Sequence, residues 1–132
     1  MRRGLITLLA CLAVAVPSAA AAAGALPAQS SAAGGVTVKA TPRMLAGPVW
    51  EFELVFDTHT QDLNDDPVKS ASLRAAGVAG AVPLAWQGDP PGGHHRKGVL
   101  RFKAPTPVPA AIELRLQRAG EPSPRVFRWQ VK

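Results

Sequence analysis

The sequence predicts an all-β protein, a two-sheet antiparallel sandwich with immunoglobulin-like connectivity and about seven strands. Apolar side chains recur at every second position in several short segments, which is the period of a strand with one face in the core. Beyond the N-terminal residues no segment keeps the apolar spacing of a helix. Prolines fall between the candidate strands, where a missing backbone donor does least harm. The number of strands alone does not show whether a sheet closes on itself, so a closed barrel is the alternative.

Residues 1–23 have the pattern of a secretory signal peptide. Arg2 and Arg3 precede an apolar run over residues 5–16, and small residues follow up to Ala23. The run is short for a membrane span, so we expect cleavage near Ala23 and no integral membrane span afterwards. Cys11 lies inside the run rather than at its end, a position that disfavours lipidation. The mature protein is therefore expected in the periplasm or outside the cell, without a cysteine.

The excess of basic residues limits the kinds of partner that the protein could bind. The chain carries 15 Lys and Arg against 9 Asp and Glu, and removal of Arg2 and Arg3 lowers its net charge from +6 to +4. The cations are spread out and do not alternate with aromatic residues, so we expect no nucleic-acid binding. A protein or an anionic component of the cell envelope is the partner that this charge allows.

The chain after the signal peptide divides into a lead and one domain. Residues 24–35 have no period and no bulky apolar side chain except Leu26, which predicts a disordered lead. Residues 36–132 form the predicted β-sandwich domain. Within it we expect strands over residues 36–39, 49–58, 70–74, 81–86, 100–103, 112–117 and 127–131.

Two aromatic pairs mark the predicted core. Trp50 and Phe52 alternate on one strand, and Phe127 and Trp129 alternate on the last one. Both pairs occupy the apolar phase of their strands, so we expect them to meet across the core as packing residues.

All three histidines fall in two segments, residues 59–66 and 92–98. Alternation extended backward from Leu100 places His94 and Arg96 in the inward phase and His95 in the outward phase. The adjacent histidines then diverge unless the loop bends, which Gly92, Gly93 and Gly98 would permit.

These histidines are the candidate metal ligands. Imidazole and carboxylate suit Zn(II) or Cu(II), and the candidate set is His59, His94, His95, Asp57 and Asp62. No HxH or HExxH spacing is present. Two other roles remain open: the imidazoles brace the loops by hydrogen bonds, or they contact a ligand or partner. Arg96 and Lys97 between glycines also suggest an anion contact.

A second cluster, residues 62–66, resembles the start of a calcium loop. Asp62, Asn64 and Asp66 alternate as oxygen ligands do there, but Pro67 follows where such a loop requires Gly, and no closing Glu is present. The favoured interpretation is a turn capped by its own side chains, with Ca(II) as the alternative.

Catalytic arrangements are missing from the sequence. Ser70, Ser72 and Ser123 lie in no nucleophile motif, and the chain has no tyrosine. Nothing in the sequence places a serine beside Asp57 and His59, so we predict a protein that is not an enzyme.

Two motifs carry a resemblance to a known family. They are Thr58-His59-Thr60-x-x-Leu63, which follows Asp57, and Gly92-Gly93-His94-His95-Arg96-x-Gly98-x-Leu100-x-Phe102, followed later by Phe127-x-Trp129. Together they resemble a family of short exported bacterial and archaeal proteins of unassigned function. The resemblance spans residues 50–129 and implies a secreted β-sandwich in which the two loops are neighbours. It implies no activity.

The sequence thus predicts a small exported binding module with a functional edge built from residues 59–66 and 92–98. A divalent metal (Zn, Cu or Ca) is the candidate small ligand. The alternative is a structural or protein-interaction sandwich without a small ligand, in which the histidines brace the loops.

Overall fold

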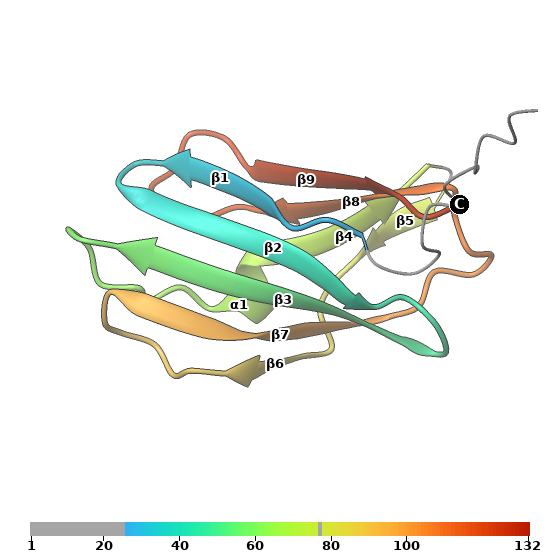
Figure 1. Cartoon of the computed structure of the whole chain (residues 1–132), viewed down its shortest axis with the longest axis horizontal. Helices are drawn as coiled ribbons and strands as arrows, with labels where there is room; N and C mark the ends of the chain where they lie inside the picture. Colours follow the sequence, from blue (N-terminus) through green and yellow to red (C-terminus); the bar gives the residue numbers. More distant parts are fainter. Residues whose placement is uncertain (1–25, 77) are drawn as a thin grey trace, which may run out of the picture.

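A computed structural model describes residues 26–76 and 78–132 (Figure 1). In this part of the chain nine strands form two antiparallel sheets. No helix described there is long and apolar enough to cross a membrane. The elements are β1 (Gln29–Ala33), β2 (Val36–Met44), β3 (Val49–Thr58), α1 (Pro67–Ser70), β4 (Ala71–Ala75), β5 (Val78–Ala81), β6 (Ala85–Gly88), β7 (His95–Lys103), β8 (Ala111–Leu116) and β9 (Arg125–Gln130).

The strand order confirms the predicted immunoglobulin-like sandwich. One sheet has the order β1-β2-β3-β7-β6 and the other β5-β4-β8-β9. Without β1, the first follows the A-B-E-D order of the immunoglobulin fold, and the second adds a short strand to C-F-G. The two sheets face each other as layers (Figure 1).

The core lies between the sheets and follows the alternation of the sequence. On β3 every second residue from Trp50 to Thr58 is buried, and the residues between are half-buried or exposed. The aromatic residues meet as predicted: the rings of Phe52 and Trp129, from opposite sheets, have centroids 5.8 Å apart. Phe102 also contacts Phe52, edge to face at 5.8 Å, a favoured aromatic geometry.

The prediction of a disordered lead over residues 24–35 is wrong where β1 forms. Gln29–Ala33 pairs with β2, and the guanidinium of Arg125 donates to the carbonyls of Ser31 and Ala33 at 2.6 and 2.8 Å. The Gln29 amide exchanges hydrogen bonds with the backbone of Arg128. These contacts come from distant residues, so the composition of the segment did not reveal them. The predicted signal peptide, residues 1–23, lies outside the described residues.

The predicted strand over residues 81–86 is two strands in different sheets. β5 ends at Ala81 in the four-stranded sheet, and β6 begins at Ala85 in the five-stranded one. Pro83 lies in the crossing between them and has no N–H to offer either sheet. With β1, this division raises the strand number from about seven to nine in the described chain.

Candidate functional site at the histidine end

The two histidine-bearing loops lie side by side at one end of the sandwich, where β3 ends and β7 begins. We call residues 57–66 together with residues 92–96 the histidine end; it is on the left of Figure 1. Leu63 N–H donates to the Gly93 carbonyl at 3.0 Å, and Gly92 N–H donates to the Leu63 carbonyl at 2.9 Å. Thr58 N–H donates to the His94 carbonyl at 2.9 Å. Backbone hydrogen bonds therefore join the loops directly.

Two of the three glycines bend the loop as expected, and the third makes room for an aromatic ring. Gly92 and Gly93 have φ angles of 113° and 73°, a region that favours glycine. Gly98 lies within β7, and a Cβ added there would approach a ring atom of Trp86 to 2.4 Å. The expectation that Gly98 helps the bend is wrong, because its role is to let the Trp86 ring lie against the strand.

The histidines are on the surface of this end. His95 Nδ1 is 2.5 Å from Asp57 Oδ1, and both side chains are more than half exposed. His59 and His94 are exposed, and their side chains make no hydrogen bond to the described residues. His95 points outward as predicted, but His94 does not point inward, because β7 begins only at His95 and His94 belongs to the turn.

The structure joins only two of the five candidate metal ligands, Asp57 and His95. In residues 26–76 and 78–132, no three or more His, Cys, Asp or Glu residues are grouped to hold a metal ion. Asp62 is exposed. The described part of the chain therefore brings two candidate ligands together at this end and does not form a complete coordination sphere.

The acidic cluster forms a cap and an ion pair. Asp66 is the N-cap of α1, and its carboxylate accepts from Val68 N–H at 3.0 Å. The carboxylate of Asp65 is bound by Arg118. These contacts agree with the capped turn, and two of the carboxylates are already engaged by the protein.

Three buried arginines support the histidine end, and of these only Arg96 was predicted to matter, as a contact for an anion. Its burial among backbone carbonyls does not favour that role. Arg96 is 3% exposed, and its guanidinium donates to the carbonyls of Asp89 (3.1 Å), Leu63 (3.3 Å) and Asp65 (2.5 Å). It also lies 5.4 Å from the centroid of the Trp86 ring, within the range of a cation–π contact. One side chain thus fixes both loops.

Two further arginines extend this support across the end of the sandwich. Arg118 binds Asp65 through Nε and Nη2 at 2.7 and 3.0 Å, and contacts Glu121 at 3.4 Å. Arg125 binds both oxygens of Glu121, at 3.0 and 2.6 Å, and donates to the Val36 carbonyl at 2.8 Å. Both arginine side chains are at most 5% exposed. We call these three arginines with Asp65 and Glu121 the arginine network.

Glu121 remains ionised within this network. The hydrogen bond from Arg125 lowers the pKa of the Glu121 carboxyl below its ordinary value of 4.5. Burial acts in the opposite direction, because it disfavours the charged form. The net direction is downward, so at neutral pH the two arginines enclose a carboxylate.

Each arginine had a signal in the sequence. Arg96 continues the inward alternation of Leu100 and Phe102, Arg118 that of Leu114 and Leu116, and Arg125 that of Phe127 and Trp129. A charged residue in the buried phase at a strand end indicates a side chain that is buried with partners.

No family model, no curated protein and no solved structure matches this chain. The resemblance to short exported proteins therefore stays a prediction, and the residues themselves carry the functional argument.

Proposed function

We propose that this protein is a small exported binding module, not an enzyme, and that the histidine end is its recognition surface. One observation carries the proposal: His59 and His94 are exposed and make no side-chain hydrogen bond to the described residues, while buried Arg96 supports the backbone that presents them. Side chains that the described fold does not use for support are free to contact something else.

The backbone that carries the histidines is held by the arginine network, and this order favours binding. A surface that is already ordered loses little conformational entropy when a partner docks, so more of the contact energy remains as affinity. Imidazole can donate or accept a hydrogen bond, ligate a metal, or gain charge near neutral pH. These properties suit a protein or cell-envelope partner that carries carboxylates or a metal ion.

A divalent metal is the small-ligand form of the proposal. Asp57 and His95 lie opposite each other on β3 and β7 and offer one carboxylate oxygen and one imidazole nitrogen, a set that suits Zn(II) or Cu(II). His95 Nδ1 and Asp57 Oδ1 are in hydrogen-bond contact at 2.5 Å, so a metal ion would have to replace the proton that the two atoms share. His94 or His59 is the proposed third ligand, and either must move to complete the set.

The second candidate is a protein-interaction sandwich without a small ligand. It is favoured by Val82 and Leu84, which are 74% and 60% exposed in the crossing between β5 and β6. Exposed apolar side chains beside a sheet edge are typical of protein contacts. In this form the histidines brace the loops, as in the His95–Asp57 contact, and bind no small ligand.

Calorimetric titration of the purified protein with Zn(II), Cu(II) and Ca(II) tests the metal form. We expect heat with Zn(II) or Cu(II), and a loss of about tenfold or more in affinity for His95→Ala and Asp57→Ala. Thr37→Ala is the matched control, because Thr37 is exposed and lies opposite Asp57 on β2. Absence of heat with all three ions would leave the protein-interaction form. Equal effects of the control and His95→Ala would also remove the metal.

A further inference from the structure

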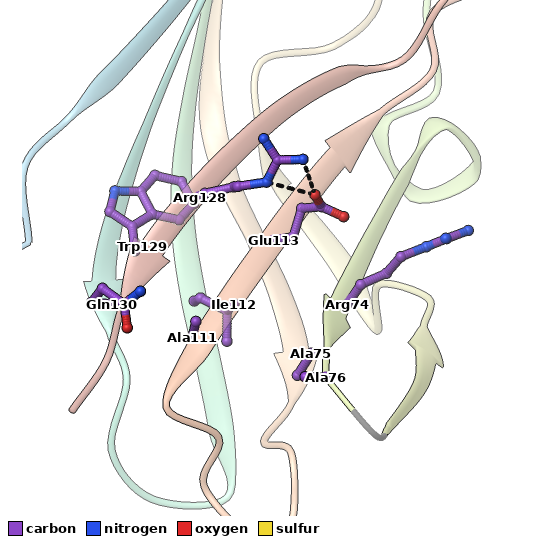
Figure 2. A pocket seen from close by; sticks show the side chains of 9 residues that line it. All are labelled: Arg74, Ala75, Ala76, Ala111, Ile112, Glu113, Arg128, Trp129 and Gln130. Carbon is purple, nitrogen blue, oxygen red and sulfur yellow. Dashed lines mark hydrogen bonds and ion pairs between the residues drawn. The ribbon is translucent and has the colours of Figure 1, made fainter.

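A second surface lies at the opposite end of the sandwich from the histidines. It is a hollow of about 450 Å³ whose lining comes from β4, β8 and β9 and from Ala76, directly after β4 (Figure 2). Its position at the start of β8 and the end of β9 places it away from Arg118 and Arg125. The volume is in the range of pockets that hold small organic molecules.

Small side chains explain why the surface is hollow. Ala75, Ala76 and Ala111 line it where neighbouring strands end, and an alanine leaves space that a larger residue would fill. Ile112 and Trp129 also border it, but their side chains are at most 4% exposed and face the core, so the alanines supply its apolar surface. The hollow therefore offers apolar contact as well as charge.

A row of charged residues borders the hollow. Arg74, Glu113 and Arg128 are aligned across β4, β8 and β9, and Figure 2 shows Arg128 directed at Glu113. Arg115 also contacts Glu113 from its own strand, with Nε 2.7 Å from the carboxylate. Arg115 and Arg128 thus contact one carboxylate, and Arg74 adds a third cation on this face, which leaves an excess of positive charge.

The cations differ in how they are held. Arg128 Nε and Nη2 lie 2.9 and 2.8 Å from the same oxygen of Glu113, so its guanidinium is oriented while the other N–H groups can still donate. Arg74 forms no ion pair with any residue of the described chain. In Figure 2 it extends from β4 on the other side of Glu113. Arg128 is thus oriented by Glu113, whereas the Arg74 side chain is directed away from the hollow and lies beside Gly80 of β5, so it must turn to reach a bound anion.

We propose that this hollow binds a small organic anion, with a carboxylate or phosphate group bound by Arg74 and Arg128 and an apolar portion against the alanines. Two strand spacings, about 10 Å, separate the backbones of these arginines, a distance that two long side chains can close on one anion. Guanidinium groups match the oxygens of both carboxylate and phosphate. The site goes beyond the proposed histidine-end function and does not depend on it.

The test is a nuclear magnetic resonance titration of the ¹⁵N-labelled protein, monitoring the arginine Nε–H signals and the amides of residues 111–113 and 128–130. Benzoate and phenyl phosphate supply an anion with an apolar body, inorganic phosphate supplies the anion alone, and benzyl alcohol supplies the body alone. We expect saturable shifts at Arg74, Arg128 and Ala111 with the first two probes. Inorganic phosphate and benzyl alcohol should each bind more weakly, because phosphate lacks the apolar body and benzyl alcohol lacks the anionic group.

Matched variants locate the site. Arg74→Gln and Arg128→Gln should each weaken binding about tenfold, the value of one charge-assisted hydrogen bond. Lys39→Gln removes the same charge from an exposed position on β2 and should leave the affinity unchanged. His95→Ala should also leave it unchanged, so failure of this site and failure of the histidine-end proposal are distinguishable.

Two outcomes would overturn the proposal. One is a set of shifts spread over all basic residues, with Lys39→Gln as harmful as Arg74→Gln, which indicates unspecific charge attraction. The other is no saturable shift around the hollow with either aromatic anion. Preference for benzoate or for phenyl phosphate supports the site in both cases, and the tighter probe identifies the head group.

Discussion

The guanidinium of Arg118 binds both carboxylate oxygens of Asp65, at 2.7 and 3.0 Å, across 53 residues of sequence. The two side chains are 5% and 12% exposed, so the pair is largely shielded from water. It connects the segment after β8 to the loop that carries His59. The histidine end is thus held by a buried ion pair from the other sheet.

Replacement of Arg118 by Met should destabilise the protein by about 3 kcal/mol, because it leaves the carboxylate of Asp65 buried without its partner. Urea denaturation followed by tryptophan fluorescence measures the free energy of unfolding. Lys69→Met is the control. Lys69 is 85% exposed, and its ammonium lies as far as 4.0 Å from the Asp66 carboxylate, so its loss should cost less than about 0.5 kcal/mol. Similar costs for the two variants would contradict a structural role for Arg118.

Replacement of Arg96 by Met should loosen the histidine end locally. The carbonyls of Leu63, Asp65 and Asp89 would lose a donor, at a cost of about 2 kcal/mol. Hydrogen exchange should accelerate at the amides of Leu63 and Gly92, which join the two loops. Lys97→Met, one position along on the outward face, should leave their exchange rates unchanged. Unchanged rates in the Arg96 variant would show that the backbone bonds alone hold the loops.

Gly98→Ala should cost about 2–3 kcal/mol, because its Cβ would overlap the ring of Trp86 and force it out of place. A Cβ at Gly93 meets nothing within 4 Å, and only its φ of 73° opposes the change, so Gly93→Ala should cost about 1 kcal/mol. Thermal unfolding of both variants tests this order. The reverse order would mean that the contact between Trp86 and β7 is not close.

Acid should weaken the arginine network through Glu121. Its pKa is lowered in the folded protein by the hydrogen bond from Arg125, so folding favours the ionised form. The stabilisation is complete above the ordinary pKa of 4.5 and is lost as the pH falls through the lowered folded value. Glu121→Gln should flatten the decline of stability below pH 4.5. A carbon NMR titration in which Glu121 titrates at or above that value would contradict this.

Much of the fold could be predicted from the sequence because one signal, apolar alternation, is also what builds a sandwich. The bounds of β3 were predicted correctly, and the aromatic residues of β3 and β9 meet in the core. The prediction missed β1 because Gln29–Ala33 has no bulky apolar residue, although the Gly34-Gly35 turn joins it to β2 as a hairpin. Arg125 and the backbone of Arg128, distant in the sequence, also hold it.

The candidate site was only half predictable. Composition and glycine spacing located the histidine loops, and alternation correctly directed His95 outward. The same alternation also directed Arg96 inward, but which carbonyls it meets depends on how the loop after β3 packs over β7. The pairing of Asp65 with Arg118 joins the loop between β3 and α1 to the segment after β8, and no local pattern links residues so far apart in the sequence.

The stability of the His59→Ala, His94→Ala, His95→Ala triple variant tests the central claim most directly, that arginines support this end and leave the histidines free for binding. Among residues 26–76 and 78–132, the one side-chain hydrogen bond or ion pair that it removes is the exposed pair of His95 with Asp57. We therefore predict a free energy of unfolding within about 1 kcal/mol of the unmodified protein. A loss as large as the roughly 3 kcal/mol expected for Arg118→Met would contradict the claim and show that the histidines brace the loops.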